Sequence, residues 1–456
     1  MKWVFLAFLI VYTPLLAAWL RSNARHAPYV WGLLGFLPFV LGPWDLYIAP
    51  VSWPGWPGFA KGAEISLLDA VALAVLISPP GRGPIPLKWP FLLYIGAVLV
   101  SVLVSNVPMA SLFYAWQLLR VLLLFAAVAA ACRDGRAPVA IVTGLVLGLG
   151  YHAVFSVIDY VSGDTQASGA LGHQNTLGIL THMVTLPALA VMLAGGRGWM
   201  PVAGPLAGVA VAILTASRAT IGLVGGGIVG LFALSVMRKP TGRKGAIALA
   251  GFAGLALAAP LALGALERRF AANPLIEDVY DERAAFEKAA SLMIADHPFG
   301  VGANQYVSIA NTGGYSDRAG VAWQVGSRSA HVHNVYLLVI AETGYLGLVA
   351  FILMLASPIL LAFRTAWRFR RDARGDLVLG LGFSLLVVAL HSFYEWIFVT
   401  FLTQYVFAVV SGLIVGVARQ LERERKPAAR ARIERKVDLA PMPAGAHATA
   451  LPAEQA

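Results

Sequence analysis

The sequence predicts an all-α protein that crosses a lipid bilayer about twelve or thirteen times. Hydrophobic residues make up 59% of the 456 residues and charged residues only 12%, whereas soluble domains carry about 25% charged residues. Apolar runs of about 18–22 residues recur along the whole chain, and each is long enough to cross a hydrocarbon core of roughly 30 Å. Because backbone in lipid must satisfy its own hydrogen bonds, and the alternation of barrel strands is absent, these runs should be helices.

The net charge of +11 is distributed as short basic clusters between the apolar runs. This pattern is typical of cytoplasmic loops rather than of a nucleic-acid-binding face, so we expect no nucleic-acid partner. The single cysteine, Cys132, excludes a disulfide framework and a thiolate metal site. The first apolar run is long and no cleavage site follows it, which favours an uncleaved first helix over a signal peptide.

Residues 1–265 contain ten of the thirteen candidate spans and should form an N-terminal transmembrane bundle. The candidates at 30–49 and 65–79 are weak, because Pro38, Pro43 and Asp45 interrupt the first, and the second is short and contains Asp69. If one of them is re-entrant, twelve spans would leave both termini inside. Thirteen spans would place the N-terminus outside, and the sequence leaves both alternatives open.

Charge fixes the orientation at the C-terminal end. Five arginines stand against one aspartate in 364–374, and eight Lys/Arg stand against four Asp/Glu in 419–438, so both stretches should be cytoplasmic. Residues 266–334 carry eight acids and six basic residues and lie one span away from a further basic cluster. We therefore predict a large outer loop at 266–334, transmembrane helices at 335–418, and a disordered cytoplasmic tail at 419–456 that is basic and then rich in Ala and Pro.

The outer loop should contain a short amphipathic helix. In DERAAFEKAASLMIADHPFGVG, Arg283, Phe286, Ala290 and Met293 follow a helical period, and the helix should end before Pro298. A lid helix resting on the membrane would explain most of its residues. Arg283 is harder to explain as a solvated charge, because it shares the stripe of the apolar positions.

Polar and ionisable side chains stand at the predicted outer ends of several spans. His173 and Asn175 lie in GALGHQNTLG, Arg218 lies in LTASRATIG, His333 lies in SAHVHNVYLL, and Glu395 lies in LHSFYEWIF. Each has an ordinary structural explanation as a turn marker or an interfacial side chain. Their gathering at one face is less ordinary, and ionisable residues at membrane depth are functional candidates by default.

Three more residues leave alternatives open. His331 stands two positions before His333, so the working histidine could be either. Glu342 interrupts an apolar helix and is a functional candidate, while Arg120 could equally snorkel, pack helices or bind a ligand.

Paired arginines with a histidine and a carboxylate suit a substrate that carries a diphosphate. The planar fork of arginine matches phosphate oxygens, and histidine can accept a proton near neutral pH. No HExxH, Walker loop or GxSxG motif is present, so neither a metal nor a nucleotide cofactor is expected.

Over about residues 170–415 the chain resembles the superfamily of O-antigen ligases and Wzy-type O-antigen polymerases, which are bacterial inner-membrane glycosyltransferases. The resemblance is carried by SRAT, by R-x-x-F-E-x-A-x-x-x-M-I-x-D-H-P-F-G-V-G, and by H-N-x-Y-L-x-x-x-A-E-T-G-Y-L-G-L. It implies a GT-C-like helical enzyme that moves a glycan from undecaprenyl diphosphate to an acceptor on the periplasmic side. The partners would be that donor, a glycan or lipid A-core acceptor, and membrane lipid.

Carried over residue by residue, the resemblance implies that His333 is the base and that Arg218 and Arg283 bind the diphosphate. The acidic residue of the last hairpin falls on Glu395, where ligases more often have Asp. His173 and Asn175 approach the same face and are assigned to donor binding.

The resemblance covers ligases, polymerases that add one more repeat unit, and protein O-glycosylating enzymes, and the motifs do not separate them. A transporter of lipid-linked glycans is the alternative from a different class. Such proteins carry ionisable residues near the bilayer midplane and symmetry between halves. In this sequence the candidate residues gather at one face and no internal repeat is visible.

Overall fold

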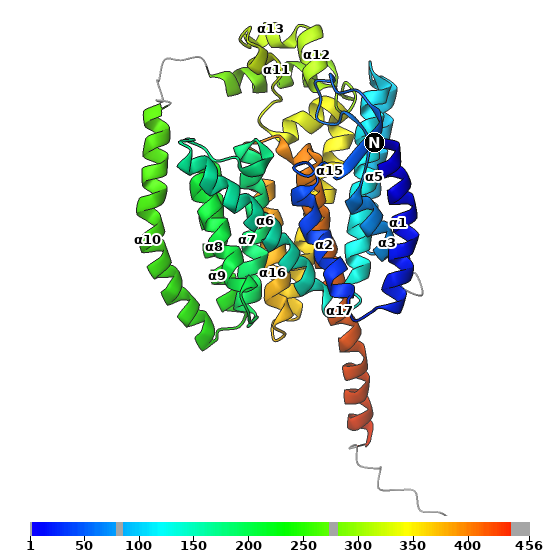
Figure 1. Cartoon of the computed structure of the whole chain (residues 1–456), viewed down its shortest axis with the longest axis vertical. Coiled ribbons are helices and arrows are strands. Elements are labelled where there is room, and N and C mark those ends of the chain that lie inside the picture. Colours follow the sequence, from blue (N-terminus) through cyan, green and yellow to red (C-terminus); the bar gives the residue numbers. More distant parts are fainter. Residues whose placement is uncertain (1, 79–84, 273–280, 439–456) are drawn as a thin grey trace, which may run out of the picture.

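The computed structural model describes residues 2–78, 85–272 and 281–438, and within them the protein is an all-α polytopic membrane protein (Figure 1). Nine of the described helices are long and apolar enough to cross a membrane. They are α1 (Lys2–Ser22), α5 (Pro108–Ala131), α6 (Ala137–Val161), α7 (Gln174–Leu193), α9 (Arg218–Arg238), α10 (Gly242–Ala272), α15 (Val335–Arg368), α16 (Arg374–His391) and α17 (Phe401–Asp438).

Four shorter apolar helices occupy the remaining predicted spans. They are α2 (Ala27–Val40), α3 (Leu67–Ile77), α4 (Lys88–Ser101) with its 3-10 extension η1 (Val102–Val104), and α8 (Met200–Leu214). The start of α1 lies at the same end of the molecule as the loop helices, and α17 leaves the bundle at the opposite end (Figure 1). The thirteen-span alternative predicts the two ends of the chain in these places, and the number of spans stays a prediction.

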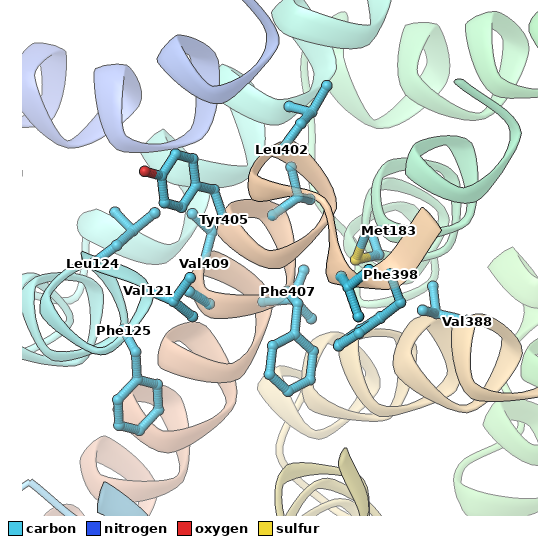
Figure 2. Packing of buried hydrophobic residues seen from close by; sticks show 14 of the residues in the cluster. Val121, Leu124, Phe125, Met183, Val388, Phe398, Leu402, Tyr405, Phe407 and Val409 are labelled. Atoms are coloured by element: carbon cyan, nitrogen blue, oxygen red, sulfur yellow. The ribbon is translucent and has the colours of Figure 1, made fainter. Parts of the chain in front are cut away.

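The core of the bundle forms around α17. Of the most apolar window of α17, 94% is buried, whereas in the corresponding window of α10 the share is 0%. Figure 2 shows Phe398 and Phe407 in this core, where their rings contact each other and also contact Phe351 and Phe91, respectively. Helix α10 stands at the edge of the bundle, so its apolar side chains are left to the surrounding lipid (Figure 1).

An antiparallel β-hairpin, β1 (Tyr47–Ser52) and β2 (Gly62–Ser66), separates α2 from α3. It was not predicted, and it forms where prolines and glycines exclude a helix. Ser66 and Asp69 make a capping box at the start of α3. Arg120 of α5 reaches Asp69 at 2.9 Å and Glu64 at 3.2 Å. The buried charge of Arg120 therefore holds the hairpin against α5. This contact gives Arg120 a structural role in helix packing.

The loop that the sequence predicts on the outer side forms α11 (Glu282–Asp296), α12 (Tyr306–Thr312), α13 (Tyr315–Ala319) and α14 (Val325–Arg328), which cover one end of the bundle (Figure 1). It is anchored at a break in α15, where Gly344 has φ +66° and ψ −174°. The carbonyls that the break frees on Ala341 and Glu342 accept the N–H groups of Val301 (3.0 Å) and Gly302 (2.9 Å). The loop backbone thus satisfies groups that an unbroken helix would satisfy itself.

Glu342 completes this anchor. Its carboxylate accepts the backbone N–H groups of Asn304 at 2.8 Å and of Tyr306 at 3.0 Å. Asn304 in turn bonds to the carbonyls of Ala60 (2.7 Å) and Ala110 (2.9 Å), which connects the loop to the β-hairpin and to α5. Glu342 is therefore occupied in holding the loop.

The tail differs from the predicted disorder at 419–438, because α17 continues as a helix to Asp438. Ala, Arg, Glu and Lys, which are strong helix formers, make up most of residues 419–438 and favour this continuation, although Pro427 lies among them. Glu422 pairs with Arg368 at 2.8 Å, and Glu424 pairs with Arg374, so the extension is fastened to the connection between α15 and α16. The predicted tail at 439–456 and part of the predicted loop at 273–280 lie outside the described residues.

Candidate active site

A buried carboxylate, Glu395, lies at the centre of the candidate site. Its side chain is 4% exposed, and it stands between α16 and the 3-10 turn η3 (Ile397–Val399). Nδ2 of Asn175 donates to its Oε1 at 2.7 Å, and Nη2 of Arg283 donates to the same oxygen at 3.3 Å. Nδ1 of His333 lies 3.2 Å from Oε2. Four segments that are far apart in the sequence therefore meet at one carboxylate.

Local helix starts hold these side chains in place. Asn334 caps α15 by accepting the N–H groups of Tyr336 and Leu337, which fixes the preceding His333. The N–H of Val335 donates to the carbonyl of Ser392 at 3.0 Å, so the start of α15 is tied to the end of α16 close to Glu395. Asp281 caps α11 in the same way and sets Arg283 in its first turn.

The orientation of His333 leaves one ring nitrogen free. Glu395 accepts a hydrogen bond from Nδ1–H when the imidazole is neutral, and Nε2 then carries the lone pair. Nε2 forms no hydrogen bond to any residue that the structure describes, and the side chain is 23% exposed. The ring of Phe286 stacks on the imidazole with centroids 6.0 Å apart. The His333 ring is thus held by Glu395 while its second nitrogen stays accessible.

His331 has the opposite environment. It is buried and stacks on Trp396 with centroids 4.1 Å apart, while Tyr306 and Phe59 cover its other sides. Burial lowers the pKa of His331 to about 3. An imidazole that stays neutral and enclosed at physiological pH packs the loop, and of the two histidines His333 is the one whose ring is accessible.

His173 lies beside the cluster without joining its hydrogen bonds. It stands directly before α7, two residues from Asn175, and its Nδ1 is buried with no partner among the described residues. Burial lowers the pKa of His173, and the nearby Glu395 carboxylate partly opposes this shift. His173 is therefore close enough to Glu395 for the two side chains to interact electrostatically.

The structure does not bring Arg218 into the cluster. Arg218 is exposed in the first turn of α9, and its guanidinium carbon lies 5.5 Å from the ring centroid of Phe270 in α10. It forms no ion pair within the described part of the chain. The start of α9 does pack against the start of α7, where Gly178 leaves room for Thr220. Arg218 and Asn175 thus stand at the same end of neighbouring helices.

Sequence reasoning missed a buried histidine pair next to this site. Nε2 of His182 in α7 lies 2.9 Å from Nδ1 of His391, the last residue of α16. The rule that ionisable residues inside spans are functional candidates could have found them. As to metals, no three His, Cys, Asp or Glu side chains converge anywhere in residues 2–78, 85–272 or 281–438.

Comparisons with known proteins agree with the resemblance seen in the sequence. Residues 183–352 match the O-antigen ligase family model, and this segment includes Arg218, Arg283 and His333. The chain is also 25% identical over 261 residues to the exopolysaccharide production protein ExoQ of Rhizobium meliloti (strain 1021). That match covers 54% of this chain and 59% of the relative, so the chain spans little more than half the length of this curated relative.

Proposed function

We propose that the chain acts as the O-antigen ligases and Wzy-type polymerases do, and moves a glycan from an undecaprenyl-diphosphate carrier to an acceptor hydroxyl. The match of residues 183–352 to the O-antigen ligase family model and the similarity to ExoQ support this proposal. The transfer would take place at the periplasmic face of the bacterial inner membrane, under the loop 266–334. The observation that carries the proposal is the contact of His333 with Glu395, beside the guanidinium of Arg283.

In the proposed reaction, Nε2 of His333 takes the proton of the acceptor hydroxyl as its oxygen attacks the anomeric carbon. The bond between that carbon and the diphosphate oxygen breaks, and its electron pair leaves with the diphosphate. Glu395 stabilises the imidazolium that forms and keeps the ring oriented, as a buried carboxylate does for a catalytic histidine elsewhere. A single displacement of this kind inverts the anomeric centre.

Arg283 supplies charge to the leaving diphosphate. Its side chain is 55% exposed and makes one 3.3 Å contact to Glu395, so most of its N–H donors remain available to phosphate oxygens. The N-termini of α7 and α9 are neighbours at this end, and helix N-termini favour anions. Arg218, in the first turn of α9, would bind the diphosphate there after leaving Phe270, with Asn175 and His173 at the start of α7.

No cofactor enters this proposal, because the diphosphate is already a good leaving group. The chemistry needs charge at the breaking bond and a base at the forming bond, and arginines and a histidine can provide both. We therefore propose a transfer that needs neither nucleotide nor metal.

Two acceptors are compatible with the site. The matching family is named for O-antigen ligases, which favours a terminal acceptor such as the lipid A-core. The relative ExoQ is named for exopolysaccharide production, which favours a second candidate function in which the acceptor is another lipid-linked repeat unit.

The test is a transfer assay with the purified full-length protein in liposomes, with a chelator and without nucleotide. One arm contains an undecaprenyl-diphosphate-linked glycan and lipid A-core, and the other contains the lipid-linked glycan alone. A glycosylated lipid A-core supports a ligase, and a ladder of longer lipid-linked glycans supports a polymerase. Movement of the glycan across the bilayer with no new glycosidic bond in either arm would identify a transporter instead.

A further inference from the structure

Trp323 is an unusually exposed aromatic residue on the loop that covers the candidate site. It lies between α13 and α14, and 83% of it is accessible. The guanidinium of Arg328 lies over the indole, 4.0 Å from the ring centroid. One face of the indole is therefore covered by a cation, and the exposed area belongs to the rest of the ring.

The arginine beneath the indole is itself fixed. Nη2 of Arg328 donates to the carbonyl of Val321 at 2.8 Å, and Nε donates to the carbonyl of Ala322 at 3.2 Å. The guanidinium also pairs with Asp317 of α13 at 2.8 Å, and the Arg328 side chain is only 14% exposed. Because its support cannot move freely, the indole is held in position before any ligand arrives.

This platform lies near the candidate site but belongs to the loop. Nδ2 of Asn311 in α12 donates to the carbonyl of Arg328 at 2.7 Å, which ties the platform to the loop helices. Arg328 and His333 are five residues apart, so their Cα atoms can be separated by roughly 18 Å at most. A chain that leaves the site could therefore pass over Trp323 within a few sugar units.

We propose that Trp323 is a stacking subsite for a sugar ring of the glycan chain, a few units from the reacting end. This inference rests on the proposed function. The C–H face of a sugar ring is apolar and packs on a flat aromatic surface, and tryptophan offers such a surface at little cost in conformational entropy. The partly exposed carboxylate of Asp317 stands beside the platform, where it can accept hydrogen bonds from sugar hydroxyls.

The surroundings of the indole favour a sugar over membrane lipid. Aromatic residues that anchor proteins at a membrane sit at the level of the headgroups. Trp323 instead adjoins α13, which carries the ion pairs of Asp317 with Arg328 and of Arg318 with Asp296. In Figure 1, α13 lies at the end of the molecule that is farthest from the end of α17.

The experiment compares Trp323→Ala, Trp323→Tyr and wild type on two lipid-linked donors, one with a single sugar and one with several repeat units. We expect Trp323→Ala to raise KM for the long donor roughly three- to tenfold, the usual worth of an aromatic contact. We expect kcat to be unchanged, the single-sugar donor to be unaffected, and Trp323→Tyr to behave nearly as wild type. Val325→Ala is the control, because Val325 is an equally exposed apolar neighbour.

Equal losses with both donors, accompanied by poorer retention of the protein in liposomes, would make Trp323 a membrane anchor and overturn the subsite. No change with either donor would overturn it as well. Binding of the free oligosaccharide, followed by saturation-transfer NMR, tests the subsite without any transfer. If wild type binds the oligosaccharide and Trp323→Ala does not, the subsite holds even where the proposed transfer fails.

Discussion

Oε2 of Glu395 lies 3.2 Å from Nδ1 of His333, although 62 positions separate the two residues in the chain. This contact gives the two residues different roles in the proposed reaction. The buried carboxylate orients the ring, and the other ring nitrogen faces outward. The same carboxylate holds Asn175 and Arg283, so the proposed base and the proposed diphosphate ligands share one support.

Replacing Glu395 by Gln should reduce transfer by roughly 10²-fold, within the range of general acid–base effects. The amide keeps the shape of the side chain but no longer stabilises the imidazolium or balances Arg283. Turnover in liposomes measures the loss, and thermal unfolding should change little. Glu287→Gln, on the exposed face of α11, is the matched control and should be silent. Full activity of Glu395→Gln would remove the carboxylate from the mechanism.

Replacing Arg283 by Lys should mainly weaken donor binding, because lysine keeps the charge but loses the planar fork. We expect a higher KM for the lipid-linked donor and unchanged binding of the acceptor. Arg218→Lys should act in the same direction if the donor draws Arg218 away from Phe270. If only the Arg218 variant showed normal donor kinetics, Arg218 would have no part in donor binding. The diphosphate site would then consist of Arg283 and the start of α7.

Replacing Gly344 by Ala should destabilise the protein by about 1–3 kcal/mol, because φ is +66° there. A Cβ at this position would also lie 2.6 Å from the carbonyl carbon of Phe299. Thermal unfolding in detergent measures the effect. Gly254→Ala in α10 is the control, since its added Cβ would meet nothing within 4 Å. Equal melting temperatures of both variants would contradict the account of the break in α15.

His331 should make stability depend on pH. Its pKa is about 3 in the folded protein, because burial disfavours the charged ring, and about 6.5 in the unfolded chain. The unfolded state therefore binds more protons between these values, so this contribution is complete above pH 6.5 and declines as the pH falls toward 3. His331→Phe should flatten that decline in melting temperature while transfer persists. An unchanged pH profile would mean that the ring is not enclosed.

The orientation can be tested by labelling single cysteines with a membrane-impermeant thiol reagent in intact spheroplasts. Gln324 on the loop and Arg370 on the connection between α15 and α16 are both exposed, so cysteines placed there are accessible to a reagent on their own side. The native Cys132 is buried and provides the background. We expect labelling at 324 and none at 370, and the reverse pattern would move the site to the cytoplasmic face.

Much of the helical framework could be predicted from the sequence, because a long apolar run in lipid has few alternatives to a helix. The starts of α7, α9 and α15 fall within one residue of the predicted spans. The β-hairpin could not be predicted, because it depends on the pairing of strands with each other and on Arg120 of a later helix. The break at Gly344 was also missed, since the groups that satisfy it come from the loop at 301–306.

The residues of the candidate site could be predicted from the sequence, but the contacts between them could not. Sequence patterns placed His333, Arg283, Asn175 and Glu395 at one face, and the structure adds that the first three meet at the carboxylate of Glu395. The role of Glu342 could not be inferred, because its partners are backbone N–H groups and no sequence pattern marks them. The separation of Arg218 from the cluster likewise depends on how α9 and α10 pack.

The most direct test of the central claim is the activity of His333→Ala in the reconstituted transfer assay, with donor binding measured in parallel. If His333 is the general base, transfer should fall by roughly 10²–10⁴-fold while donor binding persists. His331→Phe, prepared alongside, should retain most of its activity. A fully active His333→Ala, or a variant that loses donor binding as completely as transfer, would contradict the assignment of His333 as the base.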